Sequence, residues 1–515
     1  PRGSNGFAIA GDLTSSGNAM LLINPQTSFY FRPEIHVVSE EGLNAYGAVT
    51  WGQFFVYQGF NENTGWMHTS TYVDFIDEFI EDVEEIDGVL KYRYGDEMRD
   101  VWTSEVTLRY RDGDGMSERR FPLYRTHHGP ITHAVNGKWV ATKINWDPVN
   151  ALRQSFLRTK TANYDEFLDV MDIRTNSSNN TVFADSSGNI AYFHGNFVPR
   201  RNTVFDFSKP VDGSDPATDW QGIHSVTETI SLVNPPNGWL QNCNSTPFTA
   251  ALEFSPRRED YPVYMAPDDE NYRGLHAVEV LTGIDELTLD GLVELAYDPY
   301  LPAFARIAPA LIKAHNDSPD AARSEAIALV AEWDSRVATD SIAMTLMHFY
   351  ASFLQETVEI PAALSDASQM DRLEYAAVAA PADERLAVFD RTLEALAADF
   401  GDWRLRWGDV NRFQRLTGDI EHPFDDDAPS LAVGMASGRW GALAAYGARQ
   451  FEGTRKLYGY RGNSFVAVVD FGDRVVAKSL LAGGQSGNPD SAHFDDQAER
   501  YVNGEFKDVP YYRDD

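Results

Sequence analysis

Several residue types that commonly perform chemistry occur close together in this sequence. His127, His128 and His133 lie within one short segment and could together bind a metal ion. No carboxylate is suitably spaced within that segment, so we interpret all three as structural histidines. Cys243 is the only cysteine, so the chain can form neither an internal disulfide nor a thiolate metal cluster.

Three familiar catalytic signatures are missing from the sequence. No serine occupies the centre of a Gly-x-Ser-x-Gly motif, the sharp turn that exposes the nucleophile of α/β-hydrolases. Neither the His-Glu-x-x-His motif of zinc peptidases nor the Gly-x-x-x-x-Gly-Lys phosphate-binding loop occurs. The sequence therefore gives no support to any of these three chemistries.

Composition excludes two classes of partner. The chain has 515 residues, of which 77 are acidic and 43 basic, so its formal net charge is -34. That charge repels phosphate backbones and anionic lipid surfaces, and we expect neither a nucleic acid nor a membrane as partner. No apolar run reaches the roughly 18 residues that a membrane-spanning helix needs. With 43% hydrophobic residues the chain can bury a large core, and it reads as a soluble globular protein.

Three zones of the chain must position an active site. The first, about residues 5 to 250, has the alternating patterns typical of strands. Val106, Leu108 and Tyr110 alternate with polar residues and precede Asp112-Gly113, which predicts a hairpin. A second hairpin is predicted around Ser187-Gly188. The acidic stretch 78–87 alternates charged with apolar residues, and we interpret it as a solvated amphipathic element.

The other two zones predict helices and then strands again. Between about 286 and 400, apolar residues recur at helical spacing, and Gly401 is a plausible helix end. Strand patterns return at 465–471 and 475–476, on either side of Gly472-Asp473. This order predicts one α+β unit over residues 4–515, with a helical insertion at about 286–415.

A series of short segments resembles the penicillin acylase family of N-terminal nucleophile hydrolases, near its cephalosporin acylase and acyl-homoserine lactone acylase branches. The resemblance covers nearly the whole chain as the large, or β, subunit, and implies a four-layer αββα sandwich. Its markers are Gly3-Ser4-Asn5, the stretch from Gly17 to Gln26, 66–70 with Trp66-Met67-His68-Thr69-Ser70, His128-Gly129-Pro130, Asn234-Pro235-Pro236, Gln241-Asn242-Cys243-Asn244, and 484–488 with His493 and Asp496-Gln497.

By this resemblance Ser4 is the nucleophile. A serine hydroxyl needs an adjacent base, and a free α-amine titrates near about 7.7 to 8.0, so one terminal residue can supply both groups. The Gly3-Ser4 bond must then be broken, which the family does by self-cleavage of a precursor. Residues 1–3 are accordingly a remnant of a precursor or of a linker, and a chain that keeps them attached to Ser4 is expected to be inactive.

The resemblance also implies an oxyanion hole. Negative charge on the tetrahedral intermediate would be met by the backbone N–H of Ser70 and by the side chain of Asn244. Losing one such donor typically costs about a hundredfold or more in rate. The family more often has a small or apolar residue at the Ser70 position, and a backbone donor survives that change.

Further site residues follow from the same resemblance. Gln26 is expected to orient Ser4 through hydrogen bonds, and its neutral amide cannot act as a second base. Arg273 is expected to support the serine amine and the asparagine. His68 and Thr27 are expected among the substrate-binding residues, with His68 shaping the acyl pocket.

A structural calcium ion is a further implication. Asp74, Ile76 and Asp77 follow Ser70 at the spacing by which penicillin acylases present two carboxylates and a backbone carbonyl to calcium. Hard oxygen ligands suit that ion. The related branches often lack the metal, so the sequence leaves open whether this chain binds it.

The implied reaction is removal of an acyl group from an N-acyl substrate, such as an acyl-homoserine lactone or a β-lactam. The implied partner is a smaller α subunit cut from the same precursor, and the implied location is periplasmic or secreted. A non-catalytic binding or scaffold protein of the same fold stays open as the alternative. A metal-dependent amidase is disfavoured by the missing ligand motifs.

Overall fold

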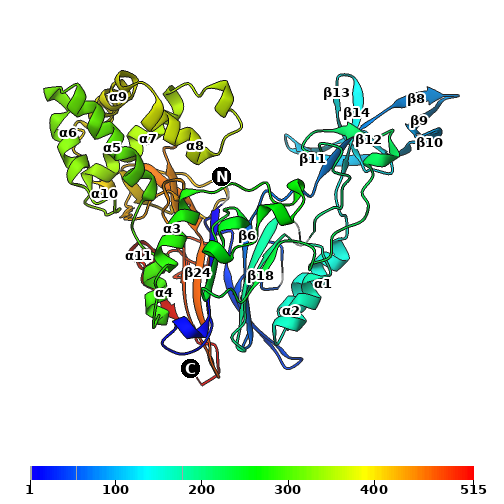
Figure 1. Cartoon of the computed structure of the whole chain (residues 1–515), viewed down its shortest axis with the longest axis horizontal. Helices are drawn as coiled ribbons and strands as arrows, with labels where there is room; N and C mark the ends of the chain where they lie inside the picture. The colour runs from blue at the N-terminus through cyan, green and yellow to red at the C-terminus, as the bar shows by residue number, and fades with distance from the viewer. Residues whose placement is uncertain (1–2, 54, 177, 196, 515) are drawn as a thin grey trace.

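The computed structural model describes residues 3–53, 55–176, 178–195 and 197–514. Its centre is two facing sheets, which Figure 1 shows with helices on both outer sides. The strands of the first sheet run in the order β21-β20-β23-β2-β24-β25-β26, with β1 between β2 and β19, and β22 beside β23. They are β1 (Gly3–Ile9), β2 (Met20–Ser28), β19 (Trp239–Asn242), β20 (Asn411–Phe413), β21 (Leu431–Ala432), β22 (Tyr446–Arg449), β23 (Leu457–Asn463), β24 (Phe465–Phe471), β25 (Val475–Leu481) and β26 (Lys507–Asp508).

The second sheet has the order β18-β16-β15-β6-β5-β4-β3. Its strands are β3 (Glu34–Ser39), β4 (Leu43–Ala48), β5 (Gln58–Phe60), β6 (Thr64–Ser70), β15 (Asn179–Asp185), β16 (Ile190–His194) and β18 (Ser231–Val233). Between the sheets lies a core that includes Ala8, Leu21, Met67, Val182 and Ala467.

Strand alternation explains the outer layers, because neighbouring residues of a strand point to opposite faces. Phe7 and Ile9 of β1 pack outward against α3 (Tyr272–Leu281) and α4 (Leu289–Ala296). Trp66 of β6 packs outward with Phe167 of α2 (Tyr164–Met171), which follows α1 (Pro148–Arg158). The predicted four-layer αββα arrangement is confirmed.

The helical zone divides into two parts in the structure. α4 packs on β24 as part of the outer layer. The later helices share a core of their own, which Figure 1 shows as a lobe at upper left. They are α5 (Pro302–Asp317), α6 (Ala321–Glu332), α7 (Ile342–Thr357), α8 (Gln369–Glu374), α9 (Ala382–Phe400) and α10 (Trp407–Val410); α11 (Ala498–Asn503) follows near the C-terminus. α9 ends at Gly401, which has the left-handed φ of 89° that glycine adopts without strain.

A third group of strands forms a separate lobe at upper right in Figure 1. It contains the predicted hairpin of β11 and β12, whose register pairs Asp112 with Gly115. Its strands are β7 (Asp77–Glu81), β8 (Val83–Ile86), β9 (Val89–Tyr94), β10 (Glu97–Asp100), β11 (Trp102–Asp112), β12 (Gly115–Arg125), β13 (Ile131–Val135), β14 (Lys138–Lys143) and β17 (Val211–Asp212).

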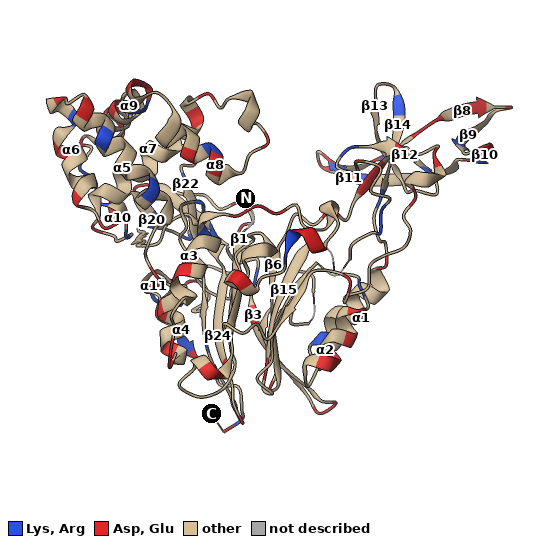
Figure 2. Cartoon of the chain, in the orientation of Figure 1, with Lys and Arg blue, Asp and Glu red and all other residues tan. Residues whose placement is uncertain are grey.

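The expectation that residues 78–87 are a solvated amphipathic element holds for β8, where Glu84 and Glu85 are exposed, and is corrected for β7. β7 and β8 are strands of this lobe, and Phe79 and Glu81 are buried. Buried partners of Glu81 from elsewhere in the chain explain the difference, since Thr126 donates to this carboxylate over 2.6 Å. Figure 2 shows acidic residues recurring on the outer helices and on β8, in keeping with the net charge. Among the described residues, no helix is long and apolar enough to cross a membrane.

Candidate active site

Ser4 lies in β1, is buried, and is paired with Pro25 of the neighbouring β2. Its backbone nitrogen donates to Oδ1 of Asn244 over 2.7 Å. Its hydroxyl donates to the carbonyl oxygen of Gly3. The predicted nucleophile and the predicted Asn244 are therefore in direct contact, although 240 residues separate them.

Arg273 connects these groups from the first turn of α3. Its Nη1 donates to the carbonyl oxygen of Ser4 and to Oδ1 of Asn5, each over 2.8 Å, and its Nη2 donates to Oδ1 of Asn244 over 2.9 Å. The helix start is fixed by Asn271, whose side chain accepts from the backbone nitrogens of Arg273 and Gly274. Burial lowers the pKa of Arg273 from its usual value, and a guanidinium remains charged at neutral pH.

Gln26 lies opposite Gly3 in the β1–β2 register and is buried. Its Nε2 donates to the carbonyl oxygen of Leu443 over 3.1 Å. A Cβ atom on Gly3 would lie only 2.5 Å from Oε1 of Gln26, so a side chain at position 3 would displace Gln26. The side chain of Thr27 instead meets Ser464, with 2.9 Å between the two hydroxyl oxygens.

Ser70 and Asn244 also meet directly. Nδ2 of Asn244 donates to the carbonyl oxygen of Ser70 over 2.6 Å. An amide nitrogen carries two hydrogens, so one stays available for another acceptor. The backbone of Asn244 has a left-handed φ of 58°, which asparagine tolerates better than most residues and which aims the side chain at Ser4.

The side chain of His68 is buried. Its Nε2 is paired with Nη1 of Arg158, and its Nδ1 lies 3.0 Å from Oγ1 of Thr181. Burial, and then the adjacent Arg158 guanidinium, hold the pKa of His68 well below its usual value. His68 is thus a neutral acceptor that positions a buried arginine.

Arg158 and Arg32 flank the ring of Tyr57, with their guanidinium carbons 6.0 and 4.8 Å from its centre. Arg158 is 1% exposed, and Nε of each arginine has no hydrogen-bond partner. No carboxylate among the described residues pairs with either of them. Sequence reasoning missed both, since an isolated arginine carries no motif. Tyr57 accepts from Nδ2 of Asn179 over 2.9 Å, and Asn179 is paired with Ser70 across β6 and β15.

The resemblance left open whether Asp74, Ile76 and Asp77 bind calcium, and in the structure both carboxylates contact Arg201. Nε of Arg201 donates to Oδ2 of Asp77 over 2.8 Å, and its Nη2 donates to the carbonyl oxygen of Asp74 over 2.9 Å. Nη2 also lies 3.4 Å from a carboxylate oxygen of Asp74, and burial raises the pKa of that carboxyl to about 6. Ile76 is exposed. The guanidinium already supplies the positive charge that calcium would bring.

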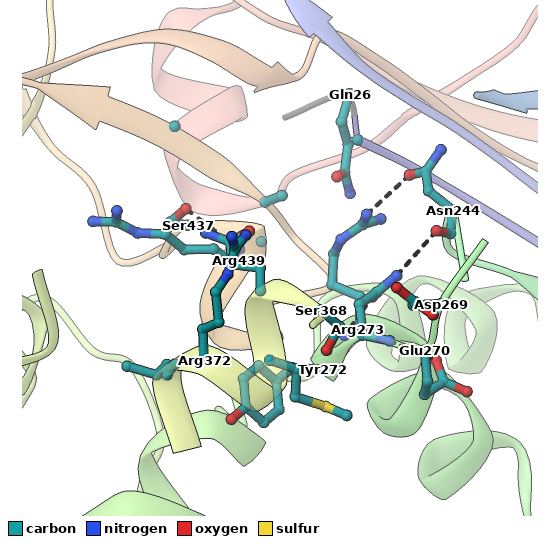
Figure 3. Close-up of a pocket in the computed structure, with 18 of the residues that line it drawn as sticks. Gln26, Asn244, Asp269, Glu270, Tyr272, Arg273, Ser368, Arg372, Ser437 and Arg439 are labelled. Carbon is teal, nitrogen blue, oxygen red and sulfur yellow. Dashed lines mark hydrogen bonds between the residues drawn. The ribbon is translucent and has the colours of Figure 1, made fainter. Parts of the chain in front are cut away.

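A cavity of about 660 Å³ opens beside Gly3, and Figure 3 shows its lining. Gln26, Asn244 and Arg273 line one side, and Arg372 of the helical lobe lies opposite. Cys243, next to Asn244, is fully buried, and burial raises the pKa of its thiol to about 12. It is therefore not a competing nucleophile.

Four of the five residues predicted to act in the reaction form one hydrogen-bonded group, namely Ser4, Ser70, Asn244 and Arg273. Gln26 adjoins it through Gly3. His68 and Thr27 lie apart from it in separate contacts. Asn5 was missed as a site residue, although it adjoins Ser4: its side chain donates to the carbonyl oxygen of Leu443 over 2.8 Å and accepts from Arg273.

Comparison with known proteins identifies relatives of this chain. The chain is 25% identical to an acyl-homoserine lactone acylase PvdQ of Pseudomonas fluorescens over 99% of its own length and 68% of the relative's. It is 25% identical to penicillin G acylase of Escherichia coli over 51% of this chain and 30% of that protein.

A solved structure and a family model extend the comparison. The structure of a thermostable penicillin G acylase from Alcaligenes faecalis matches with a TM-score of 0.71 at 19% identity, covering 99% of this chain and 97% of that one. The model of the family described as penicillin amidase matches residues 1–515. The chain belongs to the penicillin amidase family.

Proposed function

We propose that this chain is the large subunit of an acylase that hydrolyses N-acyl amides through an acyl-enzyme on Ser4. Family membership supports amide hydrolysis as the reaction class. The observation that carries the finer proposal is the single Arg273 guanidinium that holds both the Ser4 carbonyl oxygen and the Asn244 side chain. Such a contact fixes the nucleophile and a neighbouring hydrogen-bond donor in one rigid unit.

Maturation at Gly3–Ser4 is the first proposed step. The Ser4 hydroxyl oxygen attacks the Gly3 carbonyl carbon, the peptide C–N bond breaks, and the nitrogen takes up a proton to become a free amine. Water then hydrolyses the resulting ester and releases the Gly3 carboxylate. The contact of the hydroxyl with the Gly3 carbonyl oxygen supports this step, as does the close approach of Gly3 to Gln26.

The matured residue would then act on substrate. The hydroxyl oxygen attacks the amide carbon while the α-amine of Ser4 takes its proton, and the amine returns that proton to the departing nitrogen. Water, with its proton taken by the same amine, cleaves the acyl ester and releases the acid. The Ser70 backbone N–H and the second hydrogen of Asn244 Nδ2 would meet the negative charge of each tetrahedral intermediate.

Arg273 would also tune the base. Its guanidinium and the Ser4 nitrogen share one acceptor oxygen, Oδ1 of Asn244. A fixed positive charge this close disfavours a second one, so it lowers the pKa of the freed amine. The amine is then neutral, and able to accept a proton, at a lower pH than an ordinary terminus.

The arginines around Tyr57 indicate which acyl groups the site would accept. Arg158 contacts His68, which lies two residues before Ser70 and hence about 7 Å along the strand. The Arg158 guanidinium is buried with neutral partners and without a carboxylate, which is costly, and an anionic or polar acceptor that reaches it would relieve that cost. We infer that the acyl group carries an oxygen acceptor, such as a carbonyl, hydroxyl or carboxylate, a few carbons from the scissile bond.

A second subunit belongs to the proposal. The chain spans about two-thirds of the PvdQ relative, 68% of its length, so that relative has residues that this chain does not match. We propose that a smaller subunit from the same precursor completes the acyl pocket. A periplasmic or secreted location is proposed on the same family grounds.

The test is the Ser4→Ala variant of the complete precursor, assayed on a panel of amides with graded acyl groups. We expect an intact fold, no subunit cleavage, and hydrolysis lowered to background. Full activity of this variant would contradict the role of Ser4. If wild type hydrolyses none of the panel, and Ser4→Ala binds these amides as tightly as wild type does, a binding or scaffold role would be supported instead.

A further inference from the structure

Two histidines and an aspartate converge in the lobe that contains β7 to β14, apart from Ser4 (Figure 1). Nε2 of His128 lies 3.0 Å and Nε2 of His127 lies 3.5 Å from the same atom, Oδ1 of Asp219. The two histidines follow β12, and Asp219 comes from a loop about 90 residues later. The sequence showed no carboxylate near these histidines, because the one that they contact lies in that distant loop.

The surrounding side chains fix the direction of both rings. Nδ1 of His128 lies 2.9 Å from the carboxylate of Glu81, which can only accept, so this nitrogen carries the hydrogen. The ring of His128 is stacked on Phe79 at 3.9 Å and 4°. Nδ1 of His127 lies 3.1 Å from the hydroxyl of Tyr92, and the two rings stack. A carboxylate behind a ligating histidine is the usual outer support of a metal site.

The geometry calls for a positive charge at the centre of this group. Nδ1 of His128 faces Glu81 and Nε2 faces Asp219, so either a second ring hydrogen or a metal ion must lie between Nε2 and the Asp219 carboxylate. One proton can bridge only one of the two nitrogen–oxygen pairs, whereas one divalent ion can bind all three atoms. Ligands about 2.0 to 2.1 Å from a tetrahedral zinc ion lie about 3.3 to 3.4 Å apart, close to the 3.0 and 3.5 Å seen here.

Access and ligand type agree with this assignment. The side chains of His127 and Asp219 are 26% and 28% exposed, while that of His128 is fully buried, so an ion could enter from one side and keep water there. Two imidazoles and one carboxylate suit zinc and its first-row neighbours better than calcium. Tyr94 donates to the other oxygen of Asp219 and leaves Oδ1 to the histidines.

We propose that His127, His128 and Asp219 bind one divalent cation of the zinc type, with Glu81 orienting His128 and at least one position left to water. The ion would join β7, the segment between β12 and β13, and the loop at Asp219. Its role is to stabilise this lobe. It takes no part in the chemistry proposed for Ser4, so the site can be tested without any assay of hydrolysis.

The experiment measures zinc retained by the purified protein without a histidine tag. Wild type, His127→Ala and His133→Ala are stripped with a chelator, incubated with zinc sulfate at pH 7.5, desalted, and analysed for metal by mass spectrometry. His133 is the matched control, since it lies in the same segment but pairs with Glu78 outside the group. We expect one zinc per chain in wild type and in His133→Ala, and little or no retained zinc in His127→Ala, which lacks one of the three ligands.

Thermal unfolding gives the second readout. Zinc should raise the melting temperature of wild type and of His133→Ala, but not that of His127→Ala. If His127→Ala unfolds without zinc far below wild type, Asp219→Asn replaces it in the same comparison. The proposal would be overturned if wild type retained no zinc, or if His127→Ala and His133→Ala retained equal amounts. A proton on His128 would then be the charge between the histidine and Asp219.

Discussion

Nη1 of Arg273 donates to the carbonyl oxygen of Ser4 over 2.8 Å, across 269 residues of sequence. The same guanidinium reaches Asn244, whose side chain accepts from the Ser4 nitrogen. The N-terminal strand, the loop after β19 and the first turn of α3 are thereby joined at one point.

Replacing Arg273 should affect both rate and pH dependence. Arg273→Met removes three hydrogen bonds and a buried charge, and we expect hydrolysis to fall by about a hundredfold or more. Arg273→Lys should restore part of the rate because it keeps the charge. Because the nearby cation lowers the pKa of the amine, the acid limb of the profile of kcat/KM should move to higher pH in Arg273→Met. An unchanged acid limb would leave Arg273 with a structural role only.

The acyl preference should depend on Arg158. For a matched pair of amides, one with a hexanoyl group and one with a six-carbon acyl group ending in a carboxylate, wild type should favour the latter. Arg158→Met removes a guanidinium that has no carboxylate partner, and we expect the ratio of the two kcat/KM values to fall at least about tenfold. Arg153→Met, on the same helix but exposed, is the control. A ratio that is the same in Arg158→Met and in wild type would argue against an acceptor on the acyl group.

The folded protein should need Arg201 for its stability, and added calcium should not compensate for the loss of that guanidinium. Arg201→Met leaves the buried Asp77 carboxylate without its positively charged partner, with only the Trp220 indole N–H still donating to it, and such a loss typically costs about 3 to 5 kcal/mol of unfolding free energy. Urea unfolding with and without millimolar calcium measures this. Wild type should be insensitive to calcium. A wild-type protein stabilised by calcium and destabilised by its chelation would show that these carboxylates do bind the ion.

His68 should make the protein less stable in acid. Burial and Arg158 hold its pKa well below the ordinary value near 6.5. Below about pH 6.5 the unfolded chain therefore binds a proton that the folded chain does not, and stability is lost as pH falls. Between pH 7.5 and 5.5 the unfolding free energy of wild type should drop by about 1 kcal/mol more than that of His68→Gln. Parallel pH dependences of the two proteins would mean that His68 is protonated in the fold.

Local patterns in the sequence predicted the elements well, and distant contacts account for what it missed. Alternation and turn residues predicted the β11–β12 and β15–β16 hairpins, and Gly401 marked the end of α9. The group at Ser4 followed from family resemblance. Arg201 could not be anticipated as the partner of Asp77, nor Asp219 as the partner of His128, because those pairs are 124 and 91 residues apart. Local sequence alone therefore cannot tell whether an acidic or histidine segment binds a metal ion or pairs with a side chain, because the deciding charged residue lies far away along the chain.

The most direct test is the mass of the large subunit in a fully active preparation, measured before and after labelling with a substrate analogue that acylates the catalytic hydroxyl. We expect the chain to begin at Ser4 and to gain one acyl group on that residue. The Ser4→Ala precursor should remain one uncleaved polypeptide and gain none. Full activity in a preparation whose chains all retain Gly3 joined to Ser4 would contradict the mechanism.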